Sequence, residues 1–375
     1  MVRLHRFSPA RFTREIALVA SLVVCGTGVA VAASASGGGA RVGAASVAAR
    51  DARALTALLT AASRATGVEP PTTSRALVAV SAAEVWAGWR SVKPVDEPAL
   101  QRPARVGDWL HRMTFQERSH LYRRLATQVR YGEPVVVLGT RGDLSKIRIP
   151  DQTGGMFPDG IIGWIASRQL APEPATWGGW QREATVTAKS VQLRTTAGTV
   201  RLSYATTLPL LEVGAHRVVV AAAGVEKAGT LPRRAVSIHA GNAPAIRPSG
   251  QQVLDQARRF LGLPYLWAGM TSWGFDCSGL TSTVYSMLGI RLPRDAADQS
   301  RIGRQIPRGQ LRPGDLVFFS HGPRHGGIHH VAIYAGHGFV LQSPYTGARI
   351  QLTRLRGSYL NREYWSASRP LASGS

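Results

Sequence analysis

The chain has 375 residues, enough for two or three domains, and it carries 45 Lys and Arg against 22 Asp and Glu. A formal net charge of +23 indicates a polyanionic neighbourhood, although Arg richness also follows from genome composition. The basic residues are scattered rather than clustered, so the sequence indicates no nucleic-acid-binding module, and we expect no nucleic-acid partner.

Residues 1–35 have the features of an export signal. A basic start is followed by the apolar stretch 16–24 and by small-residue cleavage sites at 30–32 and 33–35. An uncleaved anchor is the alternative, because residues 16–35 are just long enough to span a bilayer. We predict an exported protein, secreted or associated with the cell envelope. In that setting anionic cell-wall polymers are candidate partners for the positive charge.

The next segments predict a linker and two small β-barrels. Residues 36–75 are rich in Ala, Ser, Gly and Thr and predict a linker, within which 52–65 are compatible with a short helix. Short apolar runs separated by Gly and Pro then indicate strands over residues 76–172 and again over 178–240. The strands expected are 78–81, 135–138, 146–149, 163–165, 191–194 and 200–204. Between the first two of them, Thr114 and Glu117 match a capping box that opens a helix toward Leu121 and Leu125.

The segment 241–250 predicts a second linker, and residues 249–372 are one domain by size. An amphipathic helix is expected over 253–261, and a second helix is expected to begin at Cys277, where apolar residues recur every four positions. Strands are expected over 315–319, 330–335 and 339–342, the last two forming a hairpin. This order of elements predicts an α+β domain.

Cys277 is the one cysteine that remains when the N-terminal signal is set aside. A thiol at the start of a helix lies at the positive end of the helix dipole, which favours the thiolate. Two interpretations follow: a cysteine nucleophile, or a buried structural cysteine. Asp276, just before it, is a candidate N-cap of the helix and also a candidate group to hold a substrate amine, and the two roles do not exclude each other.

A cysteine nucleophile needs a base, and five of the ten histidines lie between His321 and His337. A three-residue hairpin loop would pair Ala335 with Phe339 and bring His330 and Gln342 to the same face, whereas a two-residue loop would reverse the faces. In the first case the Gln342 amide oxygen can accept a bond from one ring nitrogen of His330 and fix its tautomer.

A metal site is the other interpretation of the histidines. His321, His325 and His329 are spaced by four, but the glycines and the proline among them argue against the helix that would align them. We therefore expect no metal and no cofactor. Tyr265, ahead of the thiol, is expected in the core or in the wall of a pocket.

Five segments of the last domain resemble, in order, the NlpC family of papain-like cell-wall cysteine peptidases. They are Leu263-Pro264-Tyr265-Leu266-Trp267-Ala268-Gly269, Gly274-Phe275-Asp276-Cys277-Ser278-Gly279-Leu280, Pro293-Arg294-Asp295, Pro313-Gly314-Asp315-Leu316-Val317-Phe318-Phe319 and His330-Val331-Ala332-Ile333-Tyr334-Ala335-Gly336. The resemblance implies hydrolysis of peptidoglycan stem peptides, often between γ-D-glutamate and a diamino acid. It implies Cys277 as nucleophile, His330 as base and Gln342 as the third polar group, with Tyr265, Asp276 and Ser278 shaping the substrate pocket.

The upstream segments 131–137, 149–152 and 160–165 resemble the first bacterial SH3-like domain of three-domain γ-D-glutamyl-diamino-acid dipeptidyl peptidases. The resemblance implies substrate contacts for Tyr131 and for the pair Asp96-Glu97. It also implies that this domain closes one end of the cleft and restricts substrates to stems with a free N-terminal L-alanine.

The sequence also departs from the family at three positions. Gln342 stands where His is frequent, Ala268 stands where Gly is common, and Ala296 stands near a position that carries Ser in some relatives.

The fold class predicted is therefore multidomain: two SH3-like barrels (76–172 and 178–240) followed by an α+β papain-like domain (249–372) with an antiparallel sheet. The function predicted is a cysteine peptidase acting on stem peptides or muropeptides, as a monomer. Two alternatives stay open: a catalytically silent wall-binding protein, and an acyltransferase on the same scaffold.

Overall fold

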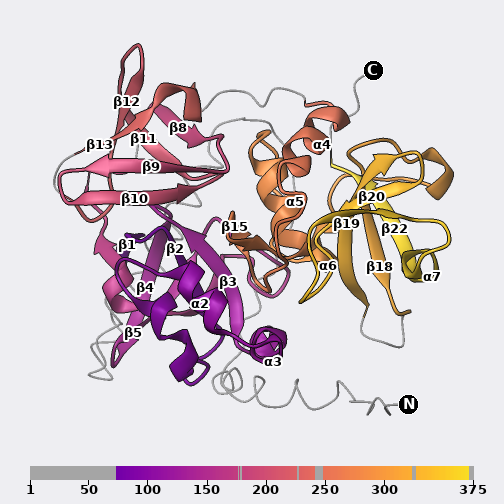
Figure 1. Cartoon of the computed structure of the whole chain (residues 1–375), viewed down its shortest axis with the longest axis horizontal. Coiled ribbons are helices and arrows are strands. Elements are labelled where there is room, and N and C mark those ends of the chain that lie inside the picture. Colours follow the sequence, from indigo (N-terminus) through magenta and orange to yellow (C-terminus); the bar gives the residue numbers. More distant parts are fainter. Residues whose placement is uncertain are drawn as a thin grey trace, which may run out of the picture. The chain divides into compact units, whose positions relative to one another are not determined.

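The computed structural model describes residues 73–175, 177, 180–225, 228–240, 248–322 and 327–370 (Figure 1). The predicted export signal, the helix expected over 52–65, most of the linker 241–250, and His325 lie outside the described residues. Among the described helices, none has the length and apolar character needed to cross a membrane.

The first sheet has seven antiparallel strands in the order β3-β2-β6-β5-β4-β1-β7. Their bounds are β1 (Ser74–Val78), β2 (Ala82–Trp86), β3 (Leu125–Arg130), β4 (Pro134–Arg141), β5 (Leu144–Ile149), β6 (Ile161–Ala166) and β7 (Leu170–Pro172), the last two separated by the 3-10 helix η4 (Ser167–Gln169). The strands predicted at 135–138, 146–149 and 163–165 are confirmed. The strand predicted at 78–81 is wrong, because the chain bends there between β1 and β2.

A helical insertion separates β2 from β3. It contains η2 (Pro94–Leu100), α2 (Val106–Arg112), α3 (Phe115–Ser119) and η3 (His120–Arg123). The capping box is confirmed, since Glu117 N–H donates to Thr114 Oγ1 at 3.2 Å and Thr114 N–H donates to the Glu117 carboxylate at 2.7 Å. The helix ends earlier than its pattern suggests, because Leu125 is buried as the first residue of β3, where it pairs with Trp86.

The second sheet also has seven antiparallel strands, in the order β10-β9-β13-β12-β11-β8-β14. Their bounds are β8 (Arg182–Val186), β9 (Ser190–Thr195), β10 (Gly198–Ser203), β11 (Thr207–Val213), β12 (Arg217–Val220), β13 (Gly229–Pro232) and β14 (Val236–Ala240), the last preceded by η5 (Arg233–Ala235). The strands predicted at 191–194 and 200–204 are confirmed, although the second ends one residue earlier, at Ser203. Closure of either sheet into an SH3-like barrel stays a prediction.

The remaining residues form an α+β arrangement on an antiparallel sheet of order β17-β22-β18-β19-β20-β21. The elements are α4 (Gly250–Arg258), β15 (Met270–Thr271), β16 (Gly274–Phe275), α5 (Cys277–Ser286), α6 (Ala296–Gln299), β17 (Arg304–Gln305), η6 (Arg308–Gln310), β18 (Leu316–Ser320), β19 (Ile328–Gly336), β20 (Phe339–Gln342), β21 (Gln351–Arg354), α7 (Tyr359–Glu363) and β22 (Tyr364–Arg369). Leu280 and Val284 of α5 are buried in one core cluster with Phe318 and Val331 of the sheet. This packing holds the start of α5 against β19 (Figure 1).

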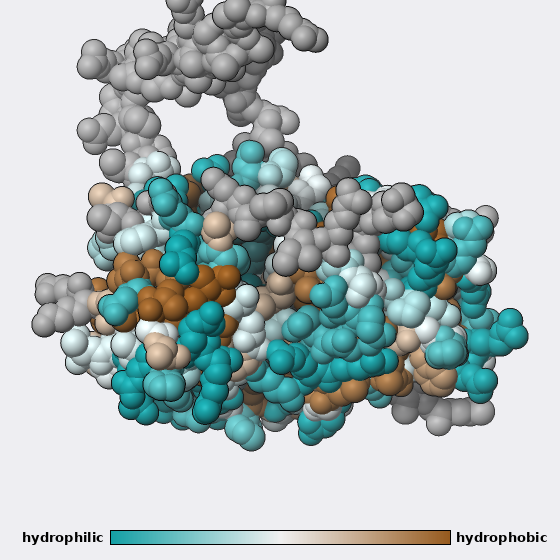
Figure 2. All heavy atoms as spheres, turned by 90° about the horizontal axis from the view of Figure 1, so that it is seen from above, coloured by the Kyte–Doolittle hydropathy of each residue, from teal (hydrophilic) through white to brown (hydrophobic). Residues whose placement is uncertain are grey.

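Much of the surface seen in Figure 2 is hydrophilic, with hydrophobic patches between. This agrees with a chain in which charged residues make up 18% of the sequence and basic residues outnumber acidic ones. The apolar side chains are buried in several clusters, and one of them joins the first two sheets, since Leu77 of β1 belongs to the same cluster as Leu208 of β11 and Leu231 of β13.

Candidate active site

Cys277 is the first residue of α5, as predicted. The Asp276 side chain caps the helix, since its Oδ1 accepts the N–H of Gly279 at 2.6 Å. Gly279 is needed here because a Cβ at this position would collide with the carbonyl oxygen of Gly269. The loop that contains Gly269 therefore passes directly over the first turn of α5, and this loop and the helix together fix the position of the thiol.

The thiol is held in its protonated form. Burial and then the charge of Asp276 raise the pKa of Cys277, the backbone N–H groups of Val331 and Ser278 and the charge of Arg294 lower it, and the net pKa is about 12. The start of α5 thus contributes the expected donors, but desolvation of the anion outweighs them. The helix start favours the thiolate as expected, and burial opposes it.

His330 and Gln342 meet on the sheet beside the thiol. His330 Nε2 lies 2.7 Å from Gln342 Oε1, and both side chains are buried. The register is the one a three-residue loop predicts, with Ile333 opposite Leu341. The loop itself has two residues, because Gly336 pairs with Phe339. A two-residue loop alone would place His330 and Gln342 on opposite faces. A β-bulge just before Gly336 adds one residue to β19 and so restores the register of the three-residue loop.

Gln342 fixes the tautomer of His330. Its amide nitrogen donates to Thr353 Oγ1 at 2.8 Å and to Tyr359 Oη at 3.3 Å, so its oxygen faces the imidazole. An amide oxygen only accepts, and therefore the proton is on Nε2 and Nδ1 is left as the basic nitrogen. Burial lowers the pKa of His330 to about 4, so the imidazole is neutral at neutral pH.

Arg294 is a member of the site to which the sequence analysis gave no role. Its guanidinium is buried and binds both Asp276 oxygens, at 2.6 Å to Oδ2 and 3.2 Å to Oδ1, and donates to Ser278 Oγ at 3.0 Å. Its Nε donates to Thr127 Oγ1 of β3 at 2.9 Å. The signal that could have found it is the segment Pro293-Arg294-Asp295, which resembled the family but has no periodicity from which to place a side chain.

Asp276, Ser278 and Tyr265 all lie near the thiol. Asp276 is both helix cap and ion-pair partner, so the two interpretations of this residue are not alternatives: its cap role is observed, and binding of a substrate amine stays a prediction. Tyr265 is half-buried; burial and then the charges of Cys277 and Asp276 raise its pKa well above the usual range, which places its ring beside them.

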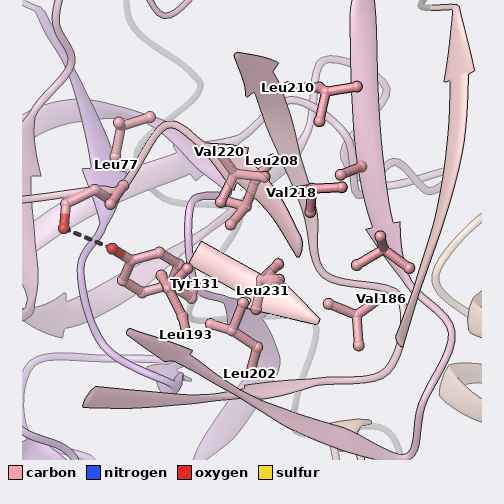
Figure 3. Packing of buried hydrophobic residues seen from close by; sticks show 14 of the residues in the cluster. Leu77, Tyr131, Val186, Leu193, Leu202, Leu208, Leu210, Val218, Val220 and Leu231 are labelled. Atoms are coloured by element: carbon pink, nitrogen blue, oxygen red, sulfur yellow. Dashed lines mark hydrogen bonds between the residues drawn. The ribbon is translucent and has the colours of Figure 1, made fainter. Parts of the chain in front are cut away.

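The structure does not bring Tyr131 or Glu97 to the thiol. Tyr131 packs in the core of the second sheet, where its hydroxyl donates to the carbonyl of Ala223 at 2.9 Å (Figure 3). Glu97 forms ion pairs with Arg105 and Arg112 at 3.3 and 3.5 Å and lines a pocket on the first sheet and its insertion. The contacts observed for both residues are structural, and a role in substrate binding stays a prediction.

In the described part of the chain, one group of side chains is spaced closely enough to hold a metal ion: His321, His329 and Glu363. It does not include Cys277 or His330. The two histidines come from the end of β18 and from β19 rather than from one helix.

Comparison with known proteins identifies the class. A model described as the NlpC/P60 family matches residues 262–369. The chain is 33% identical over 295 residues to the gamma-D-glutamyl-L-lysine dipeptidyl-peptidase of Bacillus subtilis (strain 168), which covers 76% of this chain and 96% of that protein. It is 38% identical over 128 residues to murein DD-endopeptidase MepH of Escherichia coli (strain K12), covering 33% of this chain and 47% of that protein.

A solved structure agrees. The crystal structure of an NlpC/P60 family protein from Bacillus cereus ATCC 10987 superposes with a TM-score of 0.76 at 31% identity, covering 80% of this chain and all of that chain. The chain belongs to the NlpC/P60 family. It is accordingly an enzyme, a peptidase.

Proposed function

We propose that this peptidase hydrolyses peptidoglycan stem peptides at the bond between γ-D-glutamate and a diamino acid, with Cys277 as nucleophile, His330 as base and Gln342 as the group that orients the base. The observation that supports the assignment is the buried pair of His330 on β19 and Gln342 on β20, whose side chains lie 2.7 Å apart. The backbone N–H of Val331, the residue after His330, lies at the thiol of Cys277. The choice of bond comes from the relative in Bacillus subtilis, which is named for γ-D-glutamyl-L-lysine.

The reaction begins from a neutral pair. As Sγ of Cys277 attacks the carbonyl carbon, Nδ1 of His330 takes the thiol proton, so that the thiolate forms only during attack. The negative charge that develops on the carbonyl oxygen is stabilised by the backbone N–H of Cys277 at the start of α5. The C–N bond then breaks, and the imidazolium gives its proton to the leaving amine.

The second half returns the enzyme. A water molecule gives a proton to His330 and its oxygen attacks the thioester carbonyl. The C–S bond breaks, the acyl group leaves as a carboxylic acid, and the thiol recovers its proton. Asp276 and Ser278, with Tyr265 opposite, form the pocket wall at the amine end of the substrate.

The barrels and the export signal complete the proposal. The two seven-stranded sheets act as SH3-like domains that flank the catalytic domain, and the first of them limits the length of the stem that enters. The N-terminal segment directs export to the cell envelope, where the substrate is.

Mass spectrometry of digests of defined stem peptides tests the proposed bond. L-Ala-γ-D-Glu-L-Lys-D-Ala and its meso-diaminopimelate counterpart should yield L-Ala-γ-D-Glu and the diamino-acid product. The Cys277→Ala variant should yield neither, and Cys277→Ala should keep the wild-type circular dichroism spectrum. Cleavage between the diamino acid and the terminal D-Ala of these peptides, with L-Ala-γ-D-Glu left attached to the diamino acid, would contradict the assigned bond.

The same digests address the acyltransferase alternative. With added amine acceptors, a hydrolase gives the free dipeptide at an unchanged rate, whereas a transferase gives amine conjugates. Equal product formation by wild type and Cys277→Ala would favour a silent wall-binding protein with contaminating activity.

A further inference from the structure

Three side chains outside the catalytic group converge at one end of the third sheet. His321 follows β18, His329 is on β19, and Glu363 is the last residue of α7, which lies beside the ends of β18 and β22 (Figure 1). Their donor atoms all lie within 4.8 Å of one another. His321 Nδ1 is 3.4 Å from Glu363 Oε1, and His329 Nε2 is 3.6 Å from Glu363 Oε2.

Two β-bulges produce this convergence. Phe319 pairs with His330 and Ser320 with Ile328, which leaves His329 as the extra residue of β19. On the other side of β18 the register shifts again, between the pairs Phe318–Ser366 and Phe319–Tyr364, next to Glu363. A bulge redirects the side chain of its extra residue, and bulges are frequent beside functional sites.

The imidazole rings of His321 and His329 stack with centroids 4.0 Å apart and planes 17° apart. The side chains keep solvent access, with 56% exposure for His321 and 22% for Glu363. His321 and Glu363 line a surface pocket together with Arg362, Tyr364 and Trp365.

We propose that His321, His329 and Glu363 form a binding site for a divalent transition-metal ion of the Zn²⁺ class. Two imidazole nitrogens and one carboxylate oxygen are the donor set this class takes, whereas Mg²⁺ and Ca²⁺ take oxygen donors. Metal–ligand bonds of about 2.0–2.2 Å in a tetrahedron separate the donor atoms by roughly 3.3 Å. The observed 3.4 and 3.6 Å run from the two imidazoles to different oxygens of Glu363, and one donor atom from each residue lies within 4.8 Å of the others, so side-chain rotations bring the three donors around one ion.

The fourth position is left to water or to an anion, and Arg362 in the same pocket would attract an anion there. The site adjoins the catalytic group but shares no residue with it: the rings of His329 and His330 lie 6.4 Å apart, and His330 directs its Nε2 to Gln342. The proposal therefore does not rest on the proposed peptidase mechanism. The competing account is an ordinary surface ion pair between Glu363 and one protonated histidine, with no metal.

Calorimetric titration of the untagged full chain with ZnCl₂ tests the proposal. The double variant Cys25→Ala, Cys277→Ala serves as the parent protein, because a free thiol binds zinc itself. We expect one equivalent to bind, and His321→Ala or Glu363→Gln in this background to weaken binding by about tenfold or more. The matched control is His216→Ala, an exposed histidine in the turn between β11 and β12, which should leave the affinity unchanged.

Substitution with Co²⁺ gives a second readout that does not depend on activity. A bound tetrahedral Co²⁺ absorbs visible light far more strongly than the aqueous ion, and this absorption should appear in the parent and in His216→Ala but not in His321→Ala. Absence of stoichiometric binding in the parent, or binding that His321→Ala and Glu363→Gln leave intact, would overturn the proposal. Circular dichroism of each variant confirms that the fold is retained.

Discussion

Two neighbouring residues of β3 connect the first sheet to the catalytic part in chemically different ways. Thr127 accepts a bond from Arg294, which in turn binds Asp276 beside the thiol. Gln128 accepts from Met270 N–H at 3.0 Å and from Thr271 Oγ1 at 2.7 Å, and donates to Glu84 at 2.7 Å. The first connection contains an ion pair, and the second contains none.

The difference shows how each buried acid is stabilised. The guanidinium of Arg294 binds both carboxylate oxygens of Asp276. Glu84 instead accepts one hydrogen bond, from the side-chain amide of Gln128. The other oxygen of Glu84, Oε2, has no hydrogen-bond partner among the described residues. Burial accordingly raises the pKa of Glu84 to about 8, so this carboxyl is mostly protonated at neutral pH. A full negative charge is retained next to the thiol, where a substrate amine is proposed to bind, and is suppressed in the purely structural contact.

The largest expected effect concerns the thiol at the end of the charged connection. Because burial and Asp276 raise its pKa to about 12, alkylation of Cys277 by iodoacetamide should rise about tenfold for each pH unit, roughly a thousandfold from pH 6 to pH 9. Free cysteine in the same buffers serves as the control and should level off near pH 9. A rate for Cys277 that is constant from pH 5 to 7 would instead indicate a preformed thiolate–imidazolium pair.

Arg294→Met breaks the charged connection itself. Leaving Asp276 buried without its cation should lower the free energy of unfolding by roughly 3–5 kcal/mol in urea titrations. Thr127→Val is the control, since it removes the bonds of Thr127 to Arg294 Nε and to Gln152 Oε1 but keeps the ion pair, and it should cost about 1–3 kcal/mol. Equal losses in the two variants would mean that Arg294 stabilises the fold through Thr127 rather than through Asp276.

Glu84→Gln tests the uncharged connection and should raise the free energy of unfolding, whereas Arg294→Met should lower it. With a pKa of about 8 in the folded state, well above the usual value, Glu84 makes wild-type stability fall as pH rises toward 8 and level off above it. The variant cannot ionise, so it should be more stable by on the order of 3 kcal/mol at pH 7, with little gain at pH 4. A stability gain that does not depend on pH would contradict the account of Glu84.

Gln342→Leu tests a third buried network, the one inside the catalytic sheet. Without the amide oxygen the His330 tautomer is no longer fixed, and kcat should fall roughly 100-fold while KM changes little. Gln342→His keeps a polar partner for the ring and should retain most of kcat. Full activity in Gln342→Leu would show that the orientation of His330 comes from elsewhere.

The local features of the site could be predicted from sequence because they depend on short-range patterns. The start of α5 at Cys277 followed from apolar spacing and a capping residue, and the shared face of His330 and Gln342 followed from strand alternation. His330 and Gln342 lie on the same face although the loop has two residues rather than the predicted three, because a bulge in β19 adds one residue to that strand.

Features that depend on distant contacts could not be predicted in this way. Arg294 is joined to Thr127 across 167 positions of the chain, and β22 inserts between β17 and β18. Tyr131 was assigned to substrate on resemblance alone, yet its ring packs in the core of the second sheet. The protonation of Cys277 was also missed, because a helix dipole is visible in the sequence and burial is not.

Direct detection of the acyl-enzyme tests the central claim most closely. Wild-type protein mixed with L-Ala-γ-D-Glu-L-Lys, quenched in acid within the first turnover and digested with pepsin, should carry the L-Ala-γ-D-Glu acyl group on the peptide that contains Cys277. The Cys277→Ala protein should carry no adduct and release no lysine. Release of lysine by Cys277→Ala at the wild-type rate, or an adduct on another residue, would contradict the account.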